Sequence, residues 1–136
     1  MPETFRDRSF RFALEILKYY RAITSGTDVP RHVVTQMLRA GTAIGANLEE
    51  AISASSRRDL TAKNAIALRE ARECHYWLRL IKADQAEYAL HVDRLLDECQ
   101  QLIAVLASAV RTLRLKATLR TMYFVLCTSY FVLAFS

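Results

Sequence analysis

The chain has 136 residues, 52% of them hydrophobic, and contains only three glycines and two prolines. This length suits one domain around a single core, and so few turn-forming residues exclude a fold of β-hairpins, which leaves an all-α protein. A net charge of +5 is compatible with an acidic partner or with an ordinary solvated surface.

The first two helical segments are marked by apolar residues that recur about every 3.5 positions, the period of an amphipathic helix. The first spans about residues 5–23, and we expect Gly26 to end it in a left-handed conformation. The second spans about residues 30–53, with Pro30 suited to its first turn.

Two more segments follow with the same period. The third spans about residues 58–82, after Ser55 and Ser56, which can cap its start. The fourth spans about residues 90–115. Short connections between long amphipathic helices make neighbours antiparallel, so we predict an up-down-up-down four-helix bundle.

The second and third helices should approach closely. If they fold back about Ser56, Gly41 lies opposite Ala71 and Gly45 lies opposite Ala67, so that small residues meet. Charged residues nearby exclude a bilayer as the setting of this glycine pair. We therefore expect close packing of two helices in a water-soluble bundle.

The same register predicts two polar contacts, Asn47 with Asn64 and Glu49 with Lys63. Asn64 falls on the apolar stripe of its helix, and a buried amide must find a hydrogen-bond partner. Either the two asparagines pair, or Asn64 lies at the solvated end of the bundle.

These segments contain several motifs in which polar and apolar positions recur together: Phe12-Ala13 with Ile16, Met37–Ala51, Arg58-Asp59, Ile66–Glu73 and Tyr76–Leu80. They resemble the small bacterial four-helix-bundle proteins encoded in intervening sequences of large-subunit ribosomal RNA genes. The resemblance implies a homopentamer, relatedness to the accessory variability protein of diversity-generating retroelements, nucleic-acid binding, and a partner enzyme such as a reverse transcriptase. Many members have glycine where this chain has Ala51.

A catalytic or metal site is not expected. Di-iron bundles use Glu-x-x-His pairs, and none of His32, His75 and His91 has a glutamate three positions before it. Cys74 and Cys99 fall on apolar stripes, where cysteine is usually a small buried hydrophobe. We therefore expect a non-enzymatic protein without metal or cofactor. The odd number of cysteines and the lack of an export signal favour a cytoplasmic location.

The bundle topology gathers basic residues at one end, where the first helix starts, the second meets the third, and the fourth ends. The candidate nucleic-acid-binding residues there are Arg6, Arg8, Arg57, Arg58, Arg111, Arg114, Lys116 and Arg120. Such an end would bind RNA or DNA through phosphates, with steep salt dependence. Alternatively, the last cations only complement a helix C-terminal dipole, and the protein is a structural or protein-interaction scaffold.

The bundle domain is expected to cover residues 1–116 and an apolar C-terminal tail residues 117–136. Within the tail, Met122–Phe135 has fourteen residues without a charge, fewer than the ~20 that span a bilayer as a helix. The tail could continue the fourth helix, pack back into a groove, lie between subunits or lie in a membrane interface. We expect an oligomer contact rather than membrane attachment.

Overall fold

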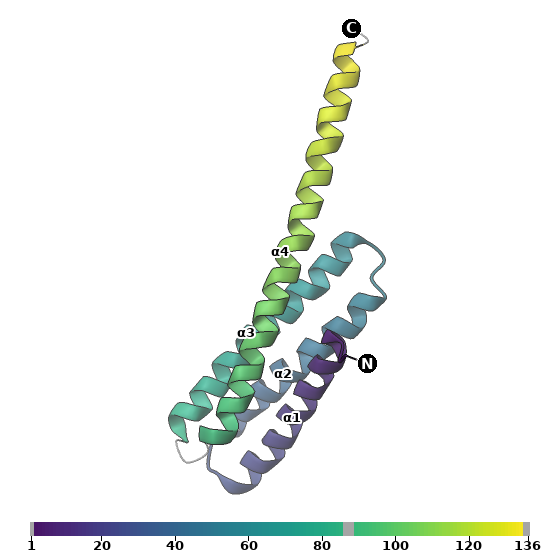
Figure 1. Cartoon of the computed structure of the whole chain (residues 1–136). Helices are drawn as coiled ribbons and strands as arrows, with labels where there is room; N and C mark the ends of the chain where they lie inside the picture. The colour runs from purple at the N-terminus through teal and green to yellow at the C-terminus, as the bar shows by residue number, and fades with distance from the viewer. Residues whose placement is uncertain (1, 86–88, 135–136) are drawn as a thin grey trace.

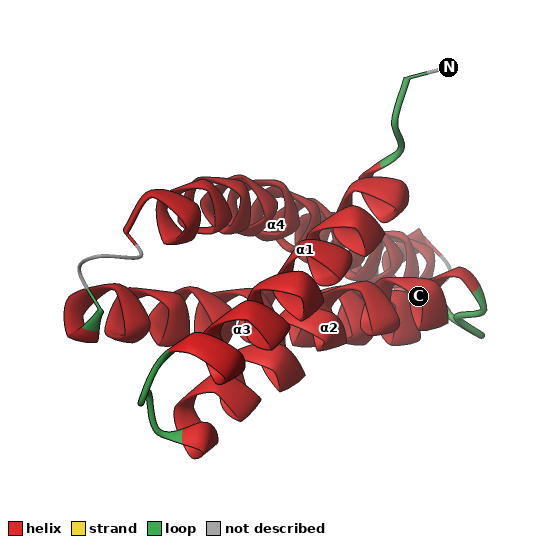
Figure 2. Cartoon of the chain, turned by 90° about the horizontal axis from the view of Figure 1, so that it is seen from below, coloured by secondary structure: helices red, strands yellow, loops and turns green. Residues whose placement is uncertain are grey.

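The protein is an all-α bundle in the computed structural model, which describes residues 2–85 and 89–134. Within these residues every regular element is an α-helix (Figure 2). The helices are α1 (Phe5–Gly26), α2 (Arg31–Ile52), α3 (Arg57–Asp84) and α4 (Ala89–Ala134). The predicted fold class is therefore confirmed.

The four helices alternate in direction and pack as a ring (Figure 1). α1 packs on α2, α2 on α3 and α3 on α4, while α1 meets α4 over a much smaller area. This is the antiparallel four-helix bundle predicted from the short connections. The contact between α1 and α4, which we call the α1–α4 seam, is the least extensive in the bundle.

The helix starts follow the capping residues in the sequence. The Thr4 hydroxyl accepts a hydrogen bond from the Asp7 N–H at 3.1 Å, and the Asp7 carboxylate accepts one from the Thr4 N–H, a capping box. Ser56 caps α3 as expected, with its Oγ accepting from the Asp59 N–H at 3.1 Å. The expectation for Gly26 is wrong, because no described residue has a positive φ and the chain leaves α1 through an extended Thr27.

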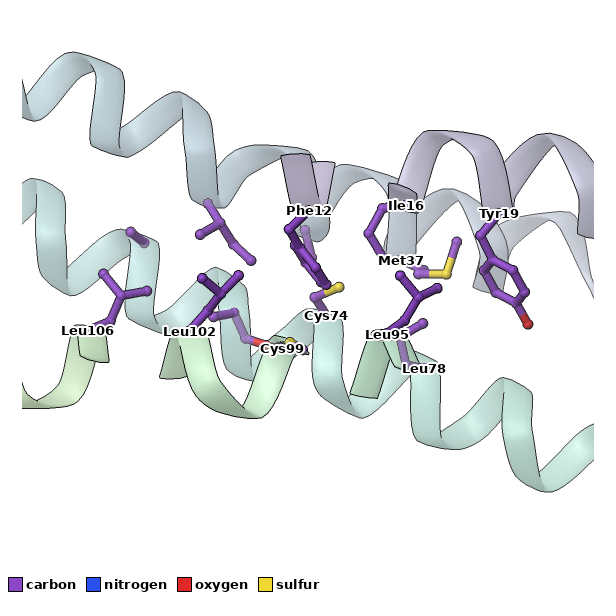
Figure 3. Packing of buried hydrophobic residues seen from close by; sticks show 14 of the residues in the cluster. Phe12, Ile16, Tyr19, Met37, Cys74, Leu78, Leu95, Cys99, Leu102 and Leu106 are labelled. Atoms are coloured by element: carbon purple, nitrogen blue, oxygen red, sulfur yellow. Dashed lines mark hydrogen bonds between the residues drawn. The ribbon is translucent and has the colours of Figure 1, made fainter. Parts of the chain in front are cut away.

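The core takes one stripe of side chains from each helix, and Figure 3 shows them pointing toward one another. α1 contributes Phe12, Ile16, Tyr19 and Ile23, all buried. The largest fully buried side chains on the other three helices are Val34, Met37, Ile44, Cys74, Leu78, Ile81, Val92, Leu102 and Leu106. Burial of this apolar surface is the main term that stabilises the bundle.

The atoms nearest to the two glycines of α2 lie mainly on α1. A Cβ added to Gly41 would lie 2.9 Å from Ile16 Cγ2 and 3.2 Å from Cys74 Sγ. A Cβ added to Gly45 would lie nearest the backbone of Ser9, at 3.6 Å. The register of α2 on α3 agrees with the ion pairs of Arg39 with Glu73 and of Lys63 with Glu50. The expectation that α3 lies nearest to both glycines is wrong, because α1 packs against the same face of α2.

The fourth helix continues well past the bundle. Among its side chains described, which end at Leu126, the last buried one is Val110. The helix nevertheless runs without a break to Ala134 and projects beyond the other three (Figure 1). We call residues 111–134 the α4 overhang. The tail expected after residue 116 is thus a continuation of the helix.

Candidate nucleic-acid interface

The predicted basic end divides into two groups, and the first, on α1, is ion-paired. Arg8 donates to Glu98 through Nε at 2.6 Å and through Nη2 at 2.9 Å, and also to Gln101 at 2.5 Å. The hydrogen bond from Arg8 lowers the pKa of Glu98. Arg11 pairs in the same way with Glu3, at 2.8 Å. Arg8 thus links α1 to α4 and is not free to bind phosphate.

Arg6 and Lys63 also have acidic neighbours. Arg6 Nε lies 3.5 Å from Glu49 Oε1, in an exposed pair. The sequence register predicts Glu49 beside Lys63, but Lys63 pairs with Glu50 instead. The prediction for Glu49 and Lys63 is therefore wrong by one position along α2.

The two predicted asparagines do not pair with each other. Asn47 Nδ2 donates to the Ala43 carbonyl and Asn64 Nδ2 to the Leu60 carbonyl, both at 2.8 Å. Each half-buried amide is satisfied by the carbonyl one turn earlier in its own helix. The Asn47–Asn64 contact is a wrong prediction, and neither residue fixes the register of α2 against α3.

The second basic group lies between the start of α3 and the α4 overhang. These segments enclose a groove of about 750 Å³, lined by Arg57, Arg58, Thr61, Ala62, Ala65, Arg114, Ala117, Thr118, Arg120 and Thr121. We call this the basic groove. Its four arginines are exposed, and no ion pair to any of them occurs among the residues described.

The position of Arg57 and Arg58 runs against the preference of a helix. They are the first two residues of α3, where the helix dipole and unpaired backbone N–H groups favour negative charge. Two arginines there add positive charge to an end that is already electropositive. The same end is one at which phosphates commonly bind.

The dipole alternative for the cations of α4 does not hold. It required the helix to end just after Arg111, Arg114 and Lys116, but α4 continues to Ala134 and has no basic residue in its last turn. Dipole effects fall off within one turn of a helix end. These cations therefore lie along an exposed mid-helix surface, where a helix end cannot explain them.

A second, smaller hollow of about 380 Å³ adjoins the basic groove. Its charged lining residues are Arg72, Arg111 and Arg114. Arg72 is an interface candidate that the sequence argument missed, because it lies in mid-α3, away from the end where cations were counted. Lys116 is exposed but lines neither hollow.

The described residues form no group of three or more histidine, cysteine, aspartate or glutamate side chains that could hold a metal. Cys74 and Cys99 are buried. The hydrogen bond to Cys99, followed by burial, raises the pKa of Cys74, which keeps its thiol neutral and weakly nucleophilic. Among the described helices, none is long and apolar enough to cross a membrane.

Fold and interface together define a small antiparallel four-helix-bundle protein with a lengthened last helix. The family model described as 23S rRNA-intervening sequence protein matches residues 4–108. The chain belongs to this family, as its motifs indicated.

The fold is similar to the solved structure of a protein of unknown function from the S23 ribosomal protein family of Bacteroides thetaiotaomicron VPI-5482. That protein is 32% identical with a TM-score of 0.74, and the match covers 79% of this chain and 98% of that one. A comparison with curated proteins finds no match. The family match stops close to Val110, so the α4 overhang lies outside the shared bundle.

Proposed function

We propose that this protein is a non-enzymatic bundle that binds RNA or DNA at the basic groove. The observation that carries the proposal is the convergence of Arg57 and Arg58 from α3 with Arg114 and Arg120 from α4. The arginines at the start of α1, in contrast, have carboxylate partners. Cations without carboxylate partners can release counterions from a nucleic-acid backbone, which drives such binding.

The lining of the basic groove favours recognition of phosphate over base. Its uncharged residues are alanines and threonines, and no aromatic side chain is found among the described lining residues. Base-stacking surfaces on single-stranded nucleic acids use aromatic rings, whereas phosphate contacts carry no direct sequence information. We expect similar affinity for unrelated sequences. The family's description refers to 23S rRNA, so RNA is the first polymer to test.

We propose further that the protein acts as a homo-oligomer, for which the family resemblance implies five copies. Phe10 and Leu14 on α1 and Tyr76 and Leu80 on α3 are large apolar side chains that the single chain leaves exposed. Several grooves in one assembly would raise the avidity for a long polymer, which a cytoplasmic partner enzyme such as a reverse transcriptase could then use. Light scattering that gave the mass of one chain would contradict the oligomer.

The central test is a double charge reversal, Arg57→Glu with Arg58→Glu, assayed by RNA titration at several salt concentrations. We expect weaker binding to all sequences and a log–log salt slope reduced by about 0.7 to 0.9 for each phosphate that the variant no longer neutralises. The fold should survive, because glutamates suit the start of a helix. Thermal unfolding followed by circular dichroism checks this.

The matched control is Arg31→Glu with Arg94→Glu, which changes the net charge equally at the opposite end of the bundle. It should leave RNA binding close to that of the parent. An equal loss of affinity in both variants, or no binding by the parent at low salt, would favour the scaffold function instead. The exposed apolar residues on α1 and α3 are the observation that supports a scaffold.

A further inference from the structure

The α4 overhang exposes a large apolar surface beyond the bundle. Among the overhang side chains that are described, the large exposed apolar ones are Leu115, Leu119, Met122, Tyr123, Phe124, Val125 and Leu126. They are between 54% and 73% exposed. Figure 1 shows this part of α4 projecting past the α2–α3 turn, with no other described helix beside its tip.

We call residues 121–134 the tip of the α4 overhang, and apolar side chains surround the helix at residues 122–126. Residues 122–126 are five consecutive exposed apolar positions, and consecutive helical residues are rotated by about 100°, so they cover every side. A groove on a folded partner would cover only one face. A helix that is apolar all round requires an apolar medium all round it.

The charges just before the tip indicate which medium this is. Arg111, Arg114, Lys116 and Arg120 precede it, and the sequence contains no aspartate or glutamate after Glu98. A parallel pair of overhangs would bring these cations together, and an antiparallel pair would place them over the partner's apolar tip. Both arrangements are unfavourable, whereas anionic lipid headgroups complement the cations.

The described part of the tip is long enough to enter one leaflet of a bilayer. Residues 121–134 rise about 21 Å as a helix, which is more than half of the ~30 Å hydrocarbon core. The basic residues would then lie at the depth of the lipid phosphates. We propose that the α4 overhang binds the surface of an anionic lipid bilayer and inserts its apolar tip into one leaflet.

This combination supplies the two signals that stable peripheral attachment requires, an apolar insertion and a cationic patch. The inference does not rest on nucleic-acid binding, although Arg114 and Arg120 belong to both surfaces. The oligomer contact expected for the tail from sequence is the competing occupant. The experiment must therefore separate lipid from a second copy of the chain.

The test is flotation of the full chain with vesicles of phosphatidylcholine, with and without phosphatidylglycerol. We expect the parent to float with the anionic vesicles and to be released by salt. Tyr123→Gln with Leu126→Gln should weaken binding about tenfold or more, because two apolar side chains that would enter the lipid become polar. Arg114→Glu with Arg120→Glu should abolish the preference for anionic vesicles.

The variant Arg31→Glu with Arg94→Glu carries the same charge change on the bundle and should float like the parent. The uncharged Tyr123 and Leu126 variant should bind RNA like the parent, which keeps this test independent of the proposed function. A parent that stays with the soluble fraction would overturn the proposal, as would a tip variant that floats equally well. Loss of a defined oligomer in the tip variant, without flotation of the parent, would identify a second copy as the occupant.

Discussion

The two halves of α4 are one continuous helix with opposite environments. From Val92 to Val110 it buries a residue every three or four positions against α3 and α1. From Leu115 to Leu126 apolar residues are equally frequent, but they are exposed. Apolar content alone therefore does not determine burial, which requires an opposing helix at the right place.

The two halves of α4 also differ in whether they belong to the bundle shared with the family. The family match ends at residue 108, close to the last buried position of α4, so the shared unit is the packed bundle. The first half of α4 is stabilised by tertiary contacts, and the overhang chiefly by its own backbone hydrogen bonds. Helices of the latter kind are marginal in water, so an external surface would stabilise the overhang.

Replacing one leucine by alanine in each half of α4 should give the largest difference in stability. Leu102 is 0% exposed and Leu119 is 63% exposed. We expect Leu102→Ala to lower the free energy of unfolding by about 2–5 kcal/mol, from reduced burial and the cavity left behind. Leu119→Ala should change it by less than about 0.5 kcal/mol. Chemical denaturation measures both, and equal effects would contradict the assignment of the overhang as unpacked.

The two glycines of α2 should respond differently to the addition of a methyl group. At Gly41 an added methyl group would lie 2.9 Å from Ile16 Cγ2, so Gly41→Ala should destabilise the protein by about 1–3 kcal/mol through overpacking. At Gly45 the nearest atom is 3.6 Å away. Gly45→Ala should stabilise by up to about 1 kcal/mol, because alanine is the better helix former. Melting temperatures that move in the same direction would contradict this packing.

The helices themselves could be predicted, because their signals are local. The third helix is predicted over 58–82 and is Arg57–Asp84 in the structure, with Ser56 as its cap. The end of α4 could not be placed, because the sequence has no glycine or proline after Gly45 and the apolar period disappears after about residue 115. Without a stop signal, the helix continues for about five more turns.

Contacts between helices were predicted less well, because they depend on rotation about each helix axis. The prediction for Gly45 considered only α2 and α3, whereas the helix that approaches Gly45 most closely is α1. The amides of Asn47 and Asn64 find carbonyls within their own helices, an option that sequence spacing does not distinguish from a cross-helix pair.

The basic end shows the same limit. Counting cations by bundle end brought Arg57, Arg58, Arg114 and Arg120 together correctly. It could not foresee that Glu98, 90 positions away, would pair with Arg8, because the register of α1 on α4 is not a local property. The sequence therefore predicted which cations of α3 and α4 meet at the basic groove. It did not predict that the arginines of α1 are ion-paired and separate from it.

The ion pair between Arg8 and Glu98 should contribute less than core burial does, and its contribution should depend on pH. Arg8 and Glu98 join the thin seam between α1 and α4, and their side chains are only 25% and 23% exposed. Glu98→Gln should lower the free energy of unfolding by about 1–2 kcal/mol at pH 7, because two charge-assisted hydrogen bonds are weakened. Glu49→Gln, in the exposed pair with Arg6, is the control and should change it by less than about 0.5 kcal/mol.

The sign of the pH dependence follows from the lowered pKa of Glu98, whose main cause is the hydrogen bond from Arg8. A carboxylate with a lowered pKa in the folded state stabilises fully above its unfolded pKa, about 4.3 for glutamate. That stabilisation is lost as the pH falls through the folded pKa. The parent should therefore lose its advantage over the Glu98→Gln variant in acid, where denaturant titrations at pH 7 and near pH 2 would converge. A gap of equal size at both pH values would mean that packing at this seam, and not the charge of Glu98, holds α1 against α4.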